Sequence, residues 1–153
     1  EVQAMRAKMV EAYTNIPEPQ SNTDLFALKD VEQVAIIYFD PGTPVVKDSD
    51  QAVLLEAARL LKAKGGKLLI VGHSSPPTDG IITQENRDAN IRVSKNRTQA
   101  VAIELRKIGV PAQLMQLEAV ADTKPVYSIN SPKGQSGNRR VEIYRLVATK
   151  KAS

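Results

Sequence analysis

The segment LLIVGHSSPP, residues 68–77, contains the residues whose types and spacing come closest to a catalytic motif. An apolar run ends there at Gly72-His73-Ser74, and a serine that follows a glycine at the end of a strand is the nucleophile of many hydrolases. That tight turn requires Gly-x-Ser-x-Gly, whereas Pro76 occupies the position of the second glycine. The segment therefore has to be tested as a nucleophile turn and as a binding loop.

A serine nucleophile needs a separate base to take its proton. His73 is the one histidine of the chain, and because it adjoins Ser74 the two side chains leave the strand in opposite directions. The chain has no cysteine, and one histidine with scattered carboxylates is too few for a metal site. We therefore expect no catalytic residue, no metal and no cofactor, and we interpret the segment as a recognition loop.

Composition and charge are those of an ordinary globular domain. The chain has 153 residues, of which 42% are hydrophobic and 25% charged, with a formal net charge of +4. The chain has only four tyrosines and two phenylalanines to accompany the basic residues of its C-terminal half, so we expect no nucleic-acid partner. No apolar stretch approaches the roughly 20 residues of a transmembrane helix. Because the chain begins at Glu1, we expect a trimmed form from which a signal or an anchor has been removed.

The spacing of apolar residues predicts alternating strands and helices. The second helix should end before Pro111, and the first should begin at Asp48 as its cap and end at Gly65. The order βαβαββ predicts an α/β (α+β) two-layer sandwich with the helices on one face of a mixed four-stranded sheet. The expected strands cover residues 34–39, 67–72, 113–118 and 139–147, and the expected helices cover residues 48–64 and 90–108.

The domain boundaries follow from composition. Residues 1–30 are expected to form an N-terminal helix and a linker that contains Pro17 and Pro19. Residues 31–148 should form the folded domain, and residues 149–153 a basic tail.

Arg97 lies on the apolar stripe of the second helix, four residues from Val93 and four from Val101. An arginine there must extend its stem to water or find an anionic partner. Ligands of open α/β folds bind beyond the carboxyl ends of the strands, the edge that the start of this helix would face. The guanidinium could hold a carboxylate through two hydrogen bonds, beside the amides of the helix N-terminus. The alternative is an internal salt bridge to Asp40, Asp79 or Asp88.

Several short motifs occur in one order along residues 34–146. They are Ile37-Tyr38-Phe39-Asp40, Val71-Gly72-His73, Asn90-x-x-Val93-Ser94-x-x-Arg97 and Asn138-Arg139-Arg140-Val141-Glu142-Ile143. This arrangement resembles the OmpA-like peptidoglycan-binding domain family. The resemblance implies noncatalytic binding to the diaminopimelate of the cell-wall peptide stem, which would anchor an envelope protein or complex to the wall.

The resemblance also implies the site. In the family, an arginine at the Arg97 position takes the diaminopimelate carboxylate, and an aspartate just after Gly-His-Thr takes its ammonium. Here Ser74 and Ser75 follow the histidine, so a serine replaces that aspartate. Asp79, in a loop longer than usual, is a candidate to supply the lost charge. The expected binding residues are thus Arg97, Asn90, Ser74, Ser75, Asp79 and Asp40, while Asn138, Arg139 and Arg140 are expected to be structural.

Two functions remain open. The first is a periplasmic anchor, associated with the outer membrane through an N-terminal anchor, that holds the stem peptide of peptidoglycan. The second is a degenerate module that has lost wall binding and serves as a protein-protein scaffold in an envelope or secretion machine. The expected partners are the stem peptide in the first case and other envelope or secretion-system proteins in the second.

Overall fold

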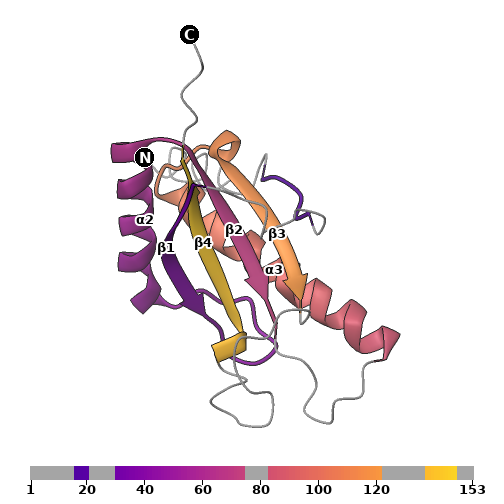
Figure 1. The fold of residues 1–153 in the computed structure, drawn as a ribbon. Coiled ribbons are helices and arrows are strands. Elements are labelled where there is room, and N and C mark those ends of the chain that lie inside the picture. Colours follow the sequence, from indigo (N-terminus) through magenta and orange to yellow (C-terminus); the bar gives the residue numbers. More distant parts are fainter. Residues whose placement is uncertain (1–15, 21–29, 75–82, 122–136, 148–153) are drawn as a thin grey trace, which may run out of the picture.

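One four-stranded sheet forms the centre of the domain. The computed structural model describes residues 16–20, 30–74, 83–121 and 137–147. The strands lie in the order β1-β4-β2-β3 (Figure 1), with β2 and β3 parallel and β4 antiparallel to both β1 and β2. Their bounds are β1 (Val31–Tyr38), β2 (Lys67–His73), β3 (Met115–Ala121) and β4 (Arg140–Leu146).

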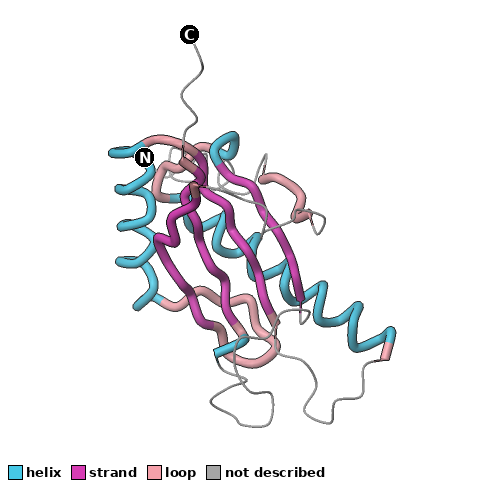
Figure 2. The backbone as a smooth tube through the Cα atoms, viewed as in Figure 1, coloured by secondary structure: helices cyan, strands magenta, loops and turns pink. Residues whose placement is uncertain are grey.

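Two helices complete the βαβαββ order, as predicted. They are α2 (Gln51–Lys64) and α3 (Gln84–Lys107), and two short 3₁₀ turns cover Asp48–Asp50 and Ala112–Leu114. Figure 2 shows the four strands side by side as one layer. Because β4 lies between β1 and β2, the β1-α2-β2 unit spans two strand positions, whereas β2-α3-β3 joins neighbours. The mixed sheet and the fold class are confirmed.

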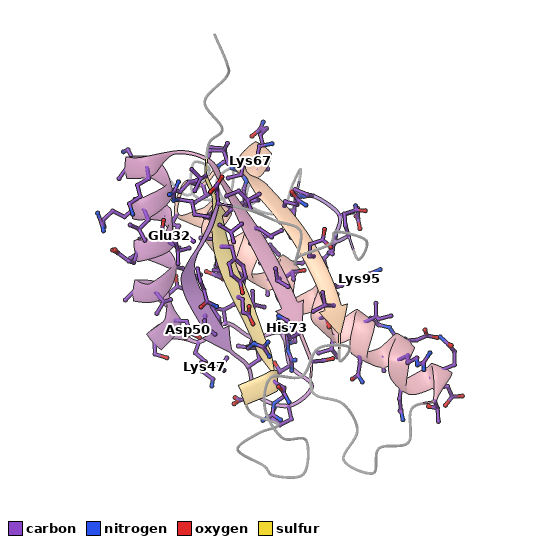
Figure 3. The ribbon with its side chains drawn as sticks, viewed as in Figure 1. Glu32, Lys47, Asp50, Lys67, His73 and Lys95 are labelled. Carbon is purple, nitrogen blue, oxygen red and sulfur yellow. The ribbon has the colours of Figure 1, made fainter. Side chains whose placement is uncertain are left out.

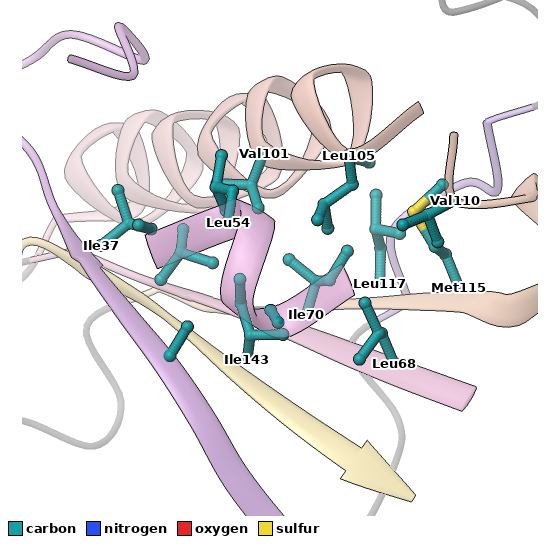
Figure 4. Close-up of a cluster of buried hydrophobic side chains, with 14 of the residues drawn as sticks. Ile37, Leu54, Leu68, Ile70, Val101, Leu105, Val110, Met115, Leu117 and Ile143 are labelled. Carbon is teal, nitrogen blue, oxygen red and sulfur yellow. The ribbon is translucent and has the colours of Figure 1, made fainter. Parts of the chain in front are cut away.

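A single hydrophobic core lies between the helices and one face of the sheet. Apolar residues from α2, from α3 and from alternate positions of the strands meet in one cluster (Figure 4). Its fully buried members include Ile37, Leu54, Leu68, Ile70, Val101, Leu105, Leu117 and Ile143. Within the described ranges, neither helix combines the length and the hydropathy that a membrane span requires.

The start of α3 differs from the prediction. The helix begins at Gln84, six residues before Asn90, and the side chain of Thr83 caps it by accepting a hydrogen bond from the Asn86 backbone N–H at 3.1 Å. At about 1.5 Å per residue, Arg97 lies about 20 Å along the axis from this end. The expectation that Arg97 sits beside the helix N-terminal amides is therefore wrong.

The start of α2 also differs. Asp48 belongs to a 3₁₀ turn and does not cap the helix; instead the Asp50 carboxylate accepts from the Lys47 backbone N–H at 3.3 Å. The helix ends as predicted, where Gly65 adopts a positive φ of 75° and its N–H donates to the Leu61 carbonyl at 2.7 Å.

Part of the expected linker packs on the domain. Gln20 pairs with the edge strand β3, donating to the Leu117 carbonyl and accepting from the Ala119 N–H, each at 2.8 Å. Ile16 packs against the core. The expected helix before residue 14 and the basic tail at 149–153 lie outside the described residues, so the proposed domain boundaries stay predictions.

Helix α3 approaches β2 closely at Gly72. A Cβ atom added there would lie 2.5 Å from the Ser94 carbonyl oxygen and 2.6 Å from Cγ2 of Thr98. Only a glycine allows this approach. The contact fixes the distance between α3 and the end of β2. Because Arg97 directly precedes Thr98, the same contact fixes the position of Arg97.

We predict that Gly72→Ala lowers the free energy of unfolding by about 1–3 kcal/mol, because the added methyl overpacks the helix against the strand. Urea unfolding monitored by circular dichroism measures it. Adding Thr98→Ser removes one clashing methyl but leaves the closer backbone oxygen, so the double variant should recover little of the loss. Full recovery would show that the helix backbone is not the limiting contact.

Candidate ligand-binding site

The candidate site lies where the carboxyl ends of β1 and β2 meet α3. Both strands run antiparallel to β4, so their carboxyl ends share one edge of the sheet. Phe39 and Asp40 follow β1, and His73 ends β2. Figure 3 shows His73 and Lys47 at this end of the molecule. The edge is the one at which ligands of such folds bind.

Arg97 is held by three backbone carbonyls from segments distant in sequence. Its Nε donates to Thr43 at 3.2 Å, its Nη1 to His73 at 3.1 Å and its Nη2 to Asp40 at 3.2 Å. The guanidinium carbon also lies 5.3 Å from the centroid of the Phe39 ring, within range of a cation-π contact. The arginine thus ties together the ends of both strands and the turn after β1.

No carboxylate of the described residues pairs with Arg97. The Asp40 side chain forms an ion pair with Nζ of Lys47 at 3.3 Å, and that of Asp88 accepts from Gln84 at 2.9 Å. The internal salt bridge to Asp40 or Asp88 is therefore not formed, while Asp79 lies outside the described residues. A guanidinium carries five N–H groups, so one N–H on each terminal nitrogen remains after the three bonds to carbonyls.

Arg97 is buried, so its stem does not carry the guanidinium out to water. The residue is 1% exposed, and burial, together with the nearby charge of Arg139, lowers its pKa to about 10. The guanidinium is still protonated at neutral pH. A buried cation without a counter-ion is costly, and the nearby positive charge adds to that cost. An anion placed against the two remaining N–H groups would offset part of it.

Ser74 adds a second polar group at the same place. Its hydroxyl oxygen is buried and has no hydrogen-bond partner among the residues that the structure describes, and the residue directly follows His73, whose carbonyl holds Arg97. Buried hydroxyl groups are usually paired, so a hydroxyl without a partner near a cation without a carboxylate, both among the described residues, indicates a place for a ligand.

The other expected residues are placed less directly. Asn90 is partly buried, and its carbonyl accepts from the Ser94 hydroxyl at 2.8 Å. It lies two turns, about 10 Å, before Arg97 along the helix, on the same side. The structure thus brings Arg97, Ser74 and the Asp40 backbone together and leaves Asn90 farther along α3, while Ser75 and Asp79 lie outside the described residues.

Arg139 supports the floor of the site, in line with its expected structural role. Its Nε donates to the Phe39 carbonyl at 3.2 Å, and its own carbonyl accepts from the Phe39 N–H at 2.9 Å. These two bonds hold the ring under the guanidinium of Arg97.

Sequence reasoning missed a buried charged cluster that surrounds Glu142 on β4. Arg140 Nε donates to its Oε1 at 2.6 Å, Tyr144 donates to its Oε2, and His73 Nε2 lies 3.3 Å from Oε1. Burial raises the pKa of Glu142, but the hydrogen bond from Tyr144, the charge of His73 and Arg140 together hold it below its ordinary value. The signal was the period-2 spacing of 140, 142 and 144, which places all three on one face of a strand.

Comparison with known proteins identifies similar chains. A family model described as the OmpA family matches residues 38–139, a range that includes Arg97 and His73. The probable lipoprotein YiaD of Escherichia coli is 28% identical over 107 residues, which are 70% of this chain and 46% of that protein. The chain therefore spans about half the length of this curated relative.

Two solved structures are also similar. The peptidoglycan-associated lipoprotein from Burkholderia pseudomallei matches with a TM-score of 0.63 and 26% identity, over 72% of this chain and 90% of that one. The cell wall anchor of the T6SS from Pseudomonas aeruginosa matches with a TM-score of 0.59 and 32% identity, over 72% of this chain and 76% of that one.

We predict that Arg97→Lys lowers the free energy of unfolding by about 1–3 kcal/mol, because a single ammonium cannot span three carbonyls that a planar guanidinium reaches. The matched control is Arg59→Lys on α2, an exposed arginine paired with Glu56, which should change stability by less than about 0.5 kcal/mol. Urea unfolding compares the two variants. Equal effects would mean that the three hydrogen bonds do not depend on guanidinium geometry.

Proposed function

Because the chain belongs to the OmpA family, whose model matches residues 38–139, we propose that it is a noncatalytic domain that anchors an envelope protein to peptidoglycan in the periplasm. Two similar structures support this general role, since one is a peptidoglycan-associated lipoprotein and the other a cell wall anchor. The ligand that we propose is the diaminopimelate of the peptide stem.

One observation carries the choice of ligand. Arg97 is a buried cation that has no carboxylate partner among the described residues and two N–H groups left over. The side chain of diaminopimelate ends in a carboxylate, which can accept both N–H groups in one plane. In a site from which water is excluded, such a charged pair is stronger than it would be at the surface. Ser74 and Ser75 would supply hydroxyl donors beside it, and Asn90 would contact the peptide farther along the helix.

The ammonium of diaminopimelate needs a negative charge, and Asp40 is the described residue best placed to supply it. The backbone carbonyl of Asp40 accepts a hydrogen bond from Nη2 of Arg97. The carboxylate of the same residue is therefore close to the site. That carboxylate is 68% exposed, and its partner is the exposed Lys47. An exposed ion pair of this kind is weak and is readily exchanged for a ligand cation. Asp79 is the second candidate for the same role.

The scaffold function has observations of its own in its favour. Ser75 replaces the aspartate of the family pattern, and Arg97 is 1% exposed. Both would follow if the domain had kept its fold for contacts with other envelope or secretion-system proteins. Binding to a soluble stem peptide separates the two functions, because a scaffold alone predicts no binding at millimolar peptide.

We predict that a stem peptide with diaminopimelate binds roughly ten- to a hundredfold more tightly than the same peptide with lysine, because lysine keeps the ammonium but lacks the carboxylate for Arg97. Isothermal titration calorimetry measures both affinities. In Arg97→Lys the difference between the peptides should shrink. Equal binding of the two peptides to the wild-type chain would remove Arg97 from the site.

We predict that Asp40→Asn weakens binding of the diaminopimelate peptide by about tenfold or more, because the ligand ammonium loses its charged partner. Lys47→Gln is the matched control: it breaks the same surface ion pair but leaves the carboxylate, and it should bind as well as the wild type or better. Both residues are exposed, so neither change should alter unfolding by more than about 0.5 kcal/mol. Wild-type affinity in Asp40→Asn would assign the ammonium to another residue.

A further inference from the structure

His73 takes part in both the candidate site and the buried cluster around Glu142. Its backbone carbonyl accepts from Nη1 of Arg97 at 3.1 Å, and its imidazole Nε2 lies 3.3 Å from Oε1 of Glu142. The residue is 5% exposed. The imidazole that contacts Glu142 and the carbonyl that holds Arg97 thus belong to a single residue.

The two contacts lie on different sides of the sheet. Leu68 and Ile70 of β2 belong to the core under the helices, so the alternate positions of this strand face the other way. Glu142 stands opposite Val71 in the register, on that second face. The imidazole thus meets the charged cluster on one face, while the carbonyl of the same residue holds the arginine that comes from the helix layer.

The charged and titratable groups of the second face come from three strands. On β4 they are Arg140, Glu142 and Tyr144, which stand next to β2. On β3, Glu118 is buried and stands opposite Val71 in the register. On β1, Tyr38 stands opposite Arg140. Among the described residues, the carboxylate within ion-pair distance of the imidazole is that of Glu142.

We propose that His73 is a positioning residue for the ligand site: its protonated imidazole, paired with Glu142, fixes the end of β2 and holds the carbonyl that orients Arg97. Loss of that proton turns the ion pair into a weaker contact between a neutral imidazole and the Glu142 carboxylate, and loosens the strand end. Binding of an anionic ligand at Arg97 is then tighter at pH 5.5 than at pH 7.5. The ligand in this inference rests on the proposed function, whereas the coupling of His73 to Arg97 is a property of the free protein.

The composition of the chain makes this coupling measurable. His73 is the one histidine, and there is no cysteine, so between pH 5.5 and 7.5 the imidazole is the side chain whose ordinary pKa falls in the range. The low pKa of Glu142, to which the charge of His73 contributes, keeps the partner ionised throughout that range. Acetylation of the peptide's N-terminus removes the titration of its N-terminal amine and leaves the side-chain ammonium of diaminopimelate in place.

The first experiment uses the free protein. Nuclear magnetic resonance follows the Nε–H signal of Arg97 and the ring signals of His73 from pH 5.5 to 7.5. We expect both to shift with the same midpoint, and we expect the Arg97 signal to stay constant in His73→Gln. If His73→Gln does not fold, Glu142→Gln replaces it and should lower the midpoint of both signals. A ring that does not titrate in this range, or an Arg97 signal that ignores the titration, overturns the coupling.

The second experiment measures binding of the acetylated diaminopimelate peptide at pH 5.5 and pH 7.5. The wild-type chain should bind roughly three- to tenfold more tightly at the lower pH, which corresponds to at most about one pKa unit of linkage. His73→Gln should bind the peptide equally tightly at both pH values. If His73 had only a structural role, the variant would keep the same ratio of affinities between the two pH values as the wild type. If the wild-type chain binds at neither pH, the proposed function fails, and the resonance experiment still decides the coupling.

Discussion

The buried guanidinium of Arg97 is the interaction on which the rest of this structure depends. Three carbonyls, from the end of β1, the turn after it and the end of β2, converge on one cation. Carbonyl dipoles and the Phe39 ring offset only part of the cost of burying a full charge. The site therefore places a buried cation against three carbonyls, and no carboxylate of the described residues pairs with it.

The two faces of the sheet contribute differently to that site. The face under the helices supplies tight apolar packing, and at Gly72 the close approach of α3 sets where Arg97 lies. The opposite face supplies ion pairs, since β4 carries Glu142 between Arg140 and Tyr144. The central position of β4 brings these charges beside the end of β2. His73 joins the two systems because a strand residue presents its side chain to one face while its carbonyl is directed along the sheet edge.

The sequence was sufficient for the order of elements and for the position of Arg97 on the buried stripe of its helix, because both follow from periodicity. It could not predict that β4 inserts between β1 and β2, since a strand pattern does not encode its neighbours. The early start of α3 was missed because the Thr83 cap lies in a stretch read as loop. The three carbonyl partners of Arg97 come from positions 40, 43 and 73, and their convergence is a property of the folded chain. The cluster around Glu142 was detectable from its spacing but was taken for a purely structural motif.

The free-energy cost of burying the Arg97 guanidinium bears on which function the site serves. The three hydrogen bonds of Arg97 support the fold, but a structural role alone does not require a buried cation that lacks a carboxylate partner among the described residues. The arrangement is favourable when an acid group arrives from outside, because the ligand then supplies a negative charge that the described residues do not place against Arg97. The energetics of this one side chain thus favour an anion receptor over a passive scaffold.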